Sequence, residues 1–190
     1  IHPESKNGEL GGVKSSVMYT NLLEKYQWGN MSDPTVYLDE TNRRMSYNFR
    51  SNFSRLSHKL IEEEEYNKAL NALEKCLTLL PKEKFEYDYY VVSLAEAYYK
   101  IGETKGGQDS NEYKKAKDLV LELTNQFEEY LLYYSNFSGE MQNNISIEIQ
   151  RGFYYFQETV NIVKKHDPIL ANELYTKLTQ LYQLFYHIHI

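Results

Sequence analysis

The stretch that decides the fold runs from Arg50 to Glu83, RSNFSRLSHKLIEEEEYNKALNALEKCLTLLPKE. Large apolar residues recur in it at helical spacing, with small residues between them. These positions are Phe53, Leu56, Ser57 and Leu60 in the first half, and Ala69, Leu73, Cys76 and Pro81 in the second. Small side chains let two antiparallel helices approach closely, while large ones fill the space beside them. Since proline cannot continue a helix, the stretch predicts a helical hairpin that ends at Pro81.

Every one of these positions matches the pattern of the tetratricopeptide repeat, a helix pair that stacks on copies of itself. A second repeat follows at 88–134, with its packing positions at Val91, Leu94, Ala95, Tyr98, Tyr113, Ala116, Val120 and Leu123. The separation from Tyr98 to Ala116 is twice that from Leu60 to Ala69, because the loop Gly102–Glu112 carries an insertion. Its Gly, Ser, Asn and Asp residues are typical of a surface loop.

A third, degenerate repeat is predicted at 145–186. Its packing positions are Phe153, Phe156, Gln157, Val160, Ala171, Tyr175 and Leu178. Asp167 followed by Pro168 is a favourable helix start, since Asp caps the first turn and Pro fits the first helical position. The segment between the second and third repeats, Ser135–Asn144, is expected to be a loop.

Residues 1–49 form the predicted N-terminal arm and the start of the first long helix. A short helix is expected at Ser16–Tyr26, and Asp39 is a plausible cap for a helix that ends near Glu64. The arm between them would lay Trp28, Tyr37 and Leu38 onto the first hairpin and cover the exposed end of the array.

The sequence thus predicts an all-α fold of about seven helices. We expect one compact domain, a short tetratricopeptide-like α-α superhelix. In it the capping arm is followed by the region 50–190, which holds the hairpins at 50–83, 88–134 and 145–186.

The bulk composition excludes several classes of function. The chain has 190 residues and a net charge of −6, which argues against nucleic acid or an anionic membrane as the main partner. One cysteine excludes an internal disulfide, and no apolar run approaches the ~18 to 20 residues needed to cross a bilayer. The chain begins with Ile, so we expect it to be a piece of a longer protein.

First-helix positions between the packing residues would face the concave side of such an array. Counting along each repeat, the candidate groove residues are Ser54, Arg55, His58, Tyr89, Val92, Glu96, Tyr99, Arg151, Tyr154 and Glu158. They are not the Lys/Asn set that clamps a peptide carboxylate, so stacking on Tyr89, Tyr99 and Tyr154 should matter more than charge. The alternative is that these tyrosines pack against neighbouring helices and leave little open groove.

No pattern in the chain predicts a catalytic or metal site. The acidic run Glu62–Glu65 lies at a helix end and is most simply a solvated turn. His187 and His189 have no Cys or carboxylate spacing of a zinc site, and Cys76 fills a packing position. No phosphate-binding loop or nucleophile elbow is present. We therefore expect no catalytic residue, no metal and no cofactor.

A family resemblance adds to this interpretation. GGVKSSVMYTNLLEKYQWGNMSDPTVYLDETNRRMSYNFRSNFSRL, with the later AEAYYKIGE, resembles the C-terminal region of a family of large bacterial membrane proteins related to the protein O-mannosyltransferases. The match is dense from Gly11 to about Leu60, continues to Glu103 and then fades. The loop Gly102–Glu112 is longer than the turn found in that family.

The resemblance implies a soluble domain of an inner-membrane protein, on the periplasmic side. Glycosyl transfer would belong to the membrane half, so no catalytic residue is carried over to this chain. The expected function is a non-catalytic interaction domain that binds a protein or peptide partner and presents acceptor polypeptide. Two alternatives stay open: a carbohydrate-binding helical repeat, and a structural cap or dimerisation domain that contacts the membrane half through Trp28 and Tyr37.

Overall fold

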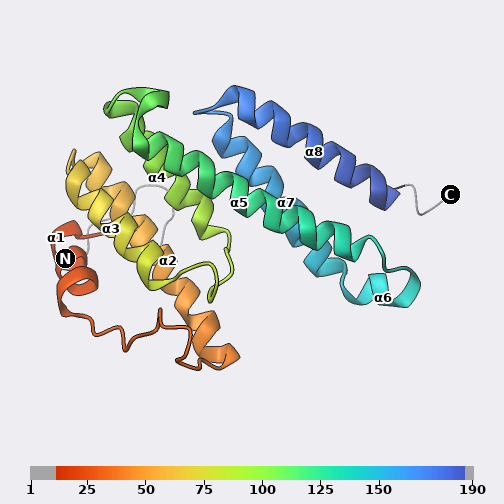
Figure 1. The fold of residues 1–190 in the computed structure, drawn as a ribbon, viewed down its shortest axis with the longest axis horizontal. Helices are drawn as coiled ribbons and strands as arrows, with labels where there is room; N and C mark the ends of the chain where they lie inside the picture. Colours follow the sequence, from red (N-terminus) through yellow and green to blue (C-terminus); the bar gives the residue numbers. More distant parts are fainter. Residues whose placement is uncertain (1–11, 187–190) are drawn as a thin grey trace. The chain divides into compact units, whose positions relative to one another are not determined.

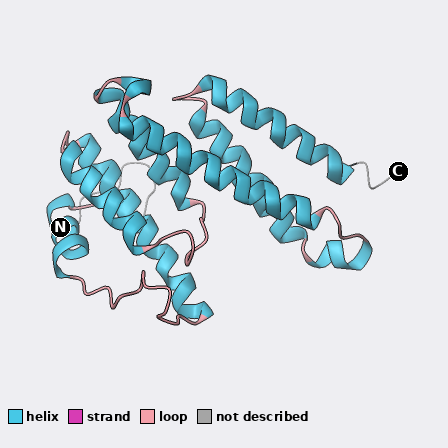
Figure 2. Ribbon diagram, in the orientation of Figure 1, coloured by secondary structure: helices cyan, strands magenta, loops and turns pink. Residues whose placement is uncertain are grey.

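The computed structural model describes residues 12–186 of the chain, and within this range the fold is all-helical without a β-strand (Figures 1 and 2). The all-α prediction is confirmed. The chain divides into two compact units, unit 1 (Ile1–Tyr113) and unit 2 (Lys114–Ile190). Each unit is described by itself below, and the single compact domain expected from the sequence stays a prediction.

Unit 1 contains the arm and the first helices. Its elements are α1 (Ser15–Tyr19), the π-helical turn η1 (Thr20–Lys25), α2 (Glu40–Glu62), α3 (Tyr66–Leu79), α4 (Tyr90–Thr104) and the 3-10 turn η2 (Gly107–Asp109). Helix α5 (Asn111–Tyr134) starts in unit 1 and continues in unit 2. The other elements of unit 2 are α6 (Gly139–Asn144), α7 (Ser146–Val163) and α8 (Pro168–Tyr186).

Two helices begin directly after the capping residues that the sequence predicted for them. The carboxylate of Asp39 accepts a hydrogen bond from the backbone N–H of Asn42 at 2.8 Å, which satisfies one of the open donors in the first turn of α2. Asp167 does the same for Leu170 at 3.0 Å, and Pro168 is the first residue of α8. Both predicted caps are therefore confirmed.

The core of unit 1 forms where α2 packs on α3 and on α4. The packing positions of the first two repeats that lie in unit 1 are all buried apart from Pro81, which is half-buried. The three that lie in unit 2 are also buried, namely Ala116, Val120 and Leu123. Cys76 is among the fully buried residues. Burial raises the pKa of its thiol to about 12, because a thiolate would lose its hydration there. The thiol is thus a small apolar side chain of the core, as its position in the repeat pattern predicted.

Glycine at position 102 permits a close approach inside unit 1. A Cβ atom built on Gly102 would lie 2.8 Å from the Ser110 Oγ and 2.8 Å from the backbone nitrogen of Tyr113. Helix α4 therefore passes the start of α5 at a distance that only glycine allows. This contact closes the long loop predicted between α4 and α5, most of which is helical in the structure.

In unit 2, α7 packs along α8. Phe153 of α7 stacks on Tyr182 of α8 with ring centroids 4.1 Å apart, and Phe156 is buried as predicted. The predicted packing position Tyr175 is wrong, because its side chain is 56% exposed while the neighbouring Leu174 is buried. The buried stripe of α8 is therefore displaced by one residue from the repeat pattern at this point.

The segment Ser135–Asn144 is not wholly a loop. It contains α6, which begins at Gly139 after the extended residue Ser138. Gly139 has φ +61°, a left-handed conformation that glycine adopts at low cost. Residues 12–186 contain eight α-helices where the sequence predicted about seven, and α6 is the additional one.

Candidate functional site

Polar side chains meet in unit 1 where α2 and α4 lie side by side. We call this group, Ser54 and His58 of α2 with Ser93, Glu96 and Lys100 of α4, the α2–α4 seam. The Nε2 of His58 lies 3.0 Å from the carbonyl oxygen of Ser93 and 3.1 Å from its Oγ. The hydroxyl of Ser54 donates to the Ser93 Oγ at 2.6 Å. Two residues predicted to lie in the groove, His58 and Glu96, are thus brought together.

The other edge of His58 faces a cation. The Nζ of Lys100 lies 3.4 Å from His58 Nδ1 and 3.1 Å from Glu96 Oε1, and Glu96 Oε2 lies 4.0 Å from His58 Nε2. A neutral imidazole fits these neighbours, with Nε2–H donating to the Ser93 carbonyl and Nδ1 accepting from the ammonium. Burial, and then the charge of Lys100, lowers the pKa of His58 below 6.5, while Glu96 opposes the shift.

The chemistry that this arrangement offers is hydrogen bonding and ion pairing. A serine nucleophile needs an imidazole that accepts its proton at one nitrogen while the other nitrogen donates to an orienting acceptor. In the seam, Nε2 is held by a carbonyl and Nδ1 faces an ammonium. The side chains of His58, Glu96 and Lys100 are 23%, 18% and 38% exposed, so all three can reach a ligand laid along the seam.

The remaining groove candidates of unit 1 lie in different environments. Arg55 is half-buried, as is Tyr89. Tyr99 is fully buried and packs edge-on against Tyr113 with ring centroids 4.7 Å apart. Its expected role as a stacking surface is therefore corrected, because a ring in the core cannot face a ligand. The predicted exposure of two smaller candidates is corrected in the same way, since Val92 and Ser54 are also buried.

The other candidates belong to unit 2. Tyr154 of α7 is 58% exposed, and its ring lies 5.7 Å from that of Tyr155. Arg151 is exposed, and Glu158 accepts a hydrogen bond from the side chain of Asn161 at 3.1 Å. Tyr154 is thus the predicted stacking residue that presents the most surface.

Arg50 is the residue that the sequence patterns missed. Its side chain is fully buried on α2, and its guanidinium is held by hydrogen bonds. The acceptors are the carbonyl oxygens of Leu80, Phe85 and Glu86 and the carboxylate of Asp88. Arg50 therefore fixes the segment between α3 and α4 onto α2.

Two aromatic rings complete the surroundings of this guanidinium. The rings of Tyr47 and Tyr87 lie 5.6 and 5.7 Å from the guanidinium carbon of Arg50, a distance at which a cation is attracted by a ring. The available sequence signal was an arginine three residues before the packing residue Phe53. Residues at this spacing share one face of a helix, so Arg50 stood in register with the core.

The N-terminal arm is held on unit 1 by its tryptophan. Trp28 packs against Phe49 and Phe53 of α2, with ring centroids 5.0 and 5.8 Å apart. Its Nε1 donates to the carbonyl oxygen of Leu22 at 3.2 Å. The predicted contact of Trp28 with the first hairpin is thus present.

A lysine holds the arm at a second point. Lys84 donates to the carbonyl oxygens of Asp33 and Val36 at 2.5 and 2.7 Å. Tyr37, which follows Val36, does not cover the first hairpin as predicted, because its side chain is 85% exposed. The ring of Trp28 and the hydrogen bonds from Lys84 therefore both attach the arm to the helices of unit 1, while the ring of Tyr37 is exposed.

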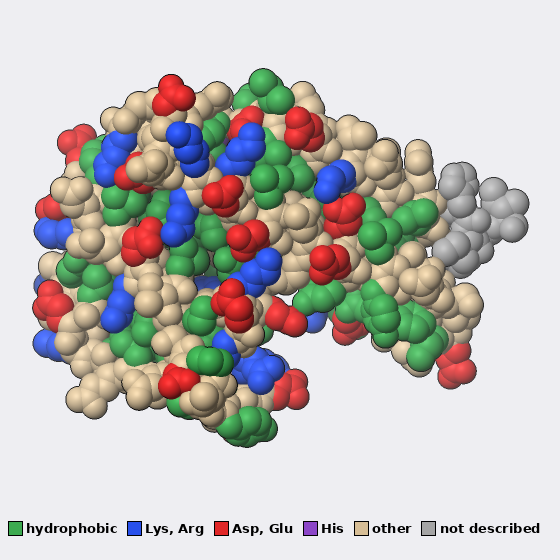
Figure 3. Space-filling model, viewed as in Figure 1, with side chains coloured by type: hydrophobic (Ala, Val, Ile, Leu, Met, Phe, Trp, Pro, Cys, Tyr) green, Lys and Arg blue, Asp and Glu red, His purple; other side chains and the backbone are tan. Residues whose placement is uncertain are grey.

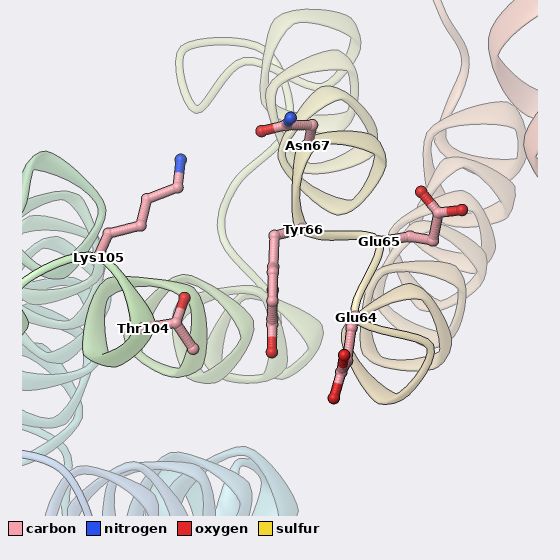
Figure 4. Close-up of a pocket in the computed structure, with 6 residues that line it drawn as sticks. All are labelled: Glu64, Glu65, Tyr66, Asn67, Thr104 and Lys105. Carbon is pink, nitrogen blue, oxygen red and sulfur yellow. The ribbon is translucent and has the colours of Figure 1, made fainter.

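A shallow, open hollow of about 290 Å³ lies at the turn between α2 and α3. It is lined by Glu64, Glu65, Tyr66, Asn67, Thr104 and Lys105. Figure 4 shows that the carboxylates of Glu64 and Glu65 point in different directions and do not converge. Glu65 pairs with Lys68 at 2.9 Å, and Lys105 pairs with Glu112 at 2.8 Å. The hollow therefore fits the solvated turn expected from the acidic run.

Within residues 12–186, no group of three or more His, Cys, Asp and Glu side chains is placed to hold a metal ion. His187 and His189 lie outside the described residues. In the same part of the chain, no helix has the length and apolar character that a membrane span requires.

Comparisons with known proteins give no relative of this chain. No protein-family model, no curated protein and no solved structure matches the chain.

Proposed function

We propose that unit 1 is a non-catalytic, tetratricopeptide-like interaction module that binds an extended polypeptide segment along the α2–α4 seam. The observation that carries the proposal is the seam itself, in which the carboxylate of Glu96 and the ammonium of Lys100 stand partly exposed beside the imidazole of His58 on two adjacent helices. The burial of the repeat positions in α2, α3 and α4 supports a hairpin array as the scaffold. In such arrays the first helices of successive hairpins line the binding face.

The wider setting is proposed from the resemblance of Gly11–Leu60 to bacterial membrane proteins related to the protein O-mannosyltransferases. In that setting the module would present acceptor polypeptide to the membrane part of the same protein, on the periplasmic side. The exposed ring of Tyr37 would then be available for contact with that part.

The test starts from a phage-displayed library of random peptides selected on the full chain. Enriched peptides are synthesised, and their dissociation constants are measured by fluorescence anisotropy against the wild type and Lys100→Glu. Lys68→Glu is the matched control, because Lys68 is also ion-paired within its helix turn but lies on α3. We expect Lys100→Glu to weaken binding about tenfold and Lys68→Glu to change it less than about twofold.

Failure of the library to yield any binder, or equal weakening by both variants, would remove the support for a peptide site on the seam. Circular dichroism of each variant shows whether the fold is kept. A peptide that binds the wild type and Lys100→Glu equally would place the site elsewhere on the chain.

A second candidate function, carbohydrate binding, is favoured by one observation. Tyr154 presents more than half of its side chain to solvent, and tyrosine faces stack well on sugar rings. Saturable quenching of tyrosine fluorescence by glycans, lost in Tyr154→Ala and kept in Tyr175→Ala, would support it. Tyr175 is the control because it is similarly exposed, at 56%, on α8.

A further inference from the structure

Apolar side chains gather at one end of unit 2, which we call the tip: the end of α5 from Glu129, the turn 135–138, α6, and the start of α7 to Glu148. Leu132, Tyr133, Met141 and Ile147 are 44%, 61%, 58% and 58% exposed. Figure 3 shows hydrophobic side chains clustered over the region where Figure 1 places α6. Exposed apolar groups that cluster in this way mark interaction surfaces more often than scattered ones do.

The tip is held in shape by contacts of its own. The ring of Tyr133 packs edge-on against Phe137 with centroids 5.0 Å apart. The side-chain amide of Asn136 donates to the carbonyl oxygens of Leu132 and Tyr133 at 2.9 and 3.2 Å. These bonds close the end of α5, so a partner would meet a surface that is already ordered and would lose less entropy on binding.

The charge of this region has a single sign. From Asp118 to Gln150 the sequence contains no Lys, Arg or His, while it contains six acidic residues. One of them, Glu128, pairs with Lys177 of α8 at 2.8 Å. The three that belong to the tip are exposed, namely Glu129, Glu140 and Glu148. The apolar surface is therefore accompanied by negative charge.

We propose that the tip of unit 2 binds a polypeptide segment in which apolar side chains stand beside Lys or Arg, such as a basic amphipathic helix. The apolar residues of the tip would contact the apolar face of the segment, and the three carboxylates would pair with its basic residues. An anionic membrane would be repelled by the same carboxylates. A second copy of the chain, meeting tip to tip, would bring like charges together.

The test uses the full chain and a synthetic amphipathic peptide with leucines on one helical face and lysines on the other. A matched peptide carries glutamates in place of the lysines. Dissociation constants are measured by anisotropy for the wild type, for Met141→Ser with Ile147→Ser, and for Glu129→Gln with Glu140→Gln and Glu148→Gln. The controls are Ile169→Ser and Glu173→Gln, which change exposed residues of α8 in the same unit.

We expect the lysine peptide to bind the wild type and the control variants alike, and the glutamate peptide not to bind. Each set of tip substitutions should weaken binding on the order of tenfold, and added salt should weaken it further because the carboxylates are exposed.

Equal binding of both peptides, or unchanged binding by both tip variants, would overturn the proposal. Binding of the wild type to phosphatidylcholine vesicles in place of the lysine peptide would also overturn it, in favour of a membrane surface. None of the substituted residues lies in the seam, so a loss of binding in the tip variants is distinguishable from a failure of the proposed function of unit 1.

Discussion

At the scale of single residues, Arg50 connects α2 to a segment that lies 30 or more positions further along the chain. Four hydrogen bonds from its guanidinium reach Leu80, Phe85, Glu86 and Asp88. Since the side chain is fully buried, these partners replace the water that the charge would otherwise bind. Removing the hydrogen bonds of Arg50 should therefore cost more free energy of unfolding than removing those of a surface arginine.

Replacing Arg50 with Met should lower the free energy of unfolding by about 3 to 5 kcal/mol, because Asp88 and three carbonyl groups lose their donor. Urea unfolding followed by circular dichroism measures the change. Arg50→Lys keeps the charge but not the planar fork, so its loss should be smaller. A loss below about 1 kcal/mol in Arg50→Met would contradict this structural role.

Because His58 is neutral in the folded protein, we expect the free energy of unfolding to depend on pH. Its pKa is lowered in the folded protein, so below 6.5 the unfolded chain binds a proton that the folded protein does not. The stability that neutral His58 contributes is complete above about pH 6.5 and is lost as pH falls through the lower folded pKa. His58→Gln cannot titrate there, so its unfolding free energy should fall less than that of the wild type between about pH 7.5 and pH 5. Parallel curves for the two proteins would show that His58 does not titrate differently in the two states.

At the scale of elements, two glycines that both permit close helix packing should respond differently to alanine. In Gly102→Ala the new Cβ meets the backbone nitrogen of Tyr113 at 2.8 Å, so α4 or α5 must move, and we expect a loss of more than about 1 kcal/mol. In Gly152→Ala the nearest atom is Cδ2 of Leu131 at 3.1 Å, a side-chain atom that needs to move by only a few tenths of an ångström. The better helix propensity of alanine should keep that variant within about 1 kcal/mol of the wild type. Thermal and urea unfolding of both variants measure the difference, and equal losses would contradict the distinction.

The arm is an element whose contribution to stability can be measured through its tryptophan. Trp28→Ala removes the ring that packs on Phe49 and Phe53, and we expect it to lower the free energy of unfolding by about 3 kcal/mol. Urea unfolding followed by far-ultraviolet circular dichroism gives the value, because this signal does not depend on the tryptophan itself. Tyr37→Ala is the control, since its exposed ring should contribute little. Equal stability of Trp28→Ala and the wild type would mean that the ring does not anchor the arm.

The second attachment of the arm predicts a local effect. Lys84→Met removes the donor to Asp33 and Val36, and should speed hydrogen exchange in residues 29–38 while global stability changes by less than about 1 kcal/mol. Lys68→Met is the control, because Lys68 makes its ion pair away from the arm, with Glu65. Unchanged exchange in Lys84→Met would mean that Lys84 does not hold the arm.

At the scale of the whole molecule, the sequence predicted the helices better than the contacts between them. Apolar periodicity and the caps Asp39 and Asp167 are local signals, and they located α2, α3, α7 and α8. The contacts of Arg50 and the burial of Tyr99 depend on residues far apart in the chain, which periodicity does not describe. Helix α6 was missed because six mostly polar residues carry no helical period.

The buried Cys76 has a practical consequence. It is the only cysteine of the chain, it lies in the core of unit 1, and its pKa of about 12 leaves almost no thiolate at neutral pH. A thiol reagent can therefore modify the native protein only during transient openings that expose α3. The labelling rate of this single natural probe would report how often unit 1 opens, without any substitution in the chain.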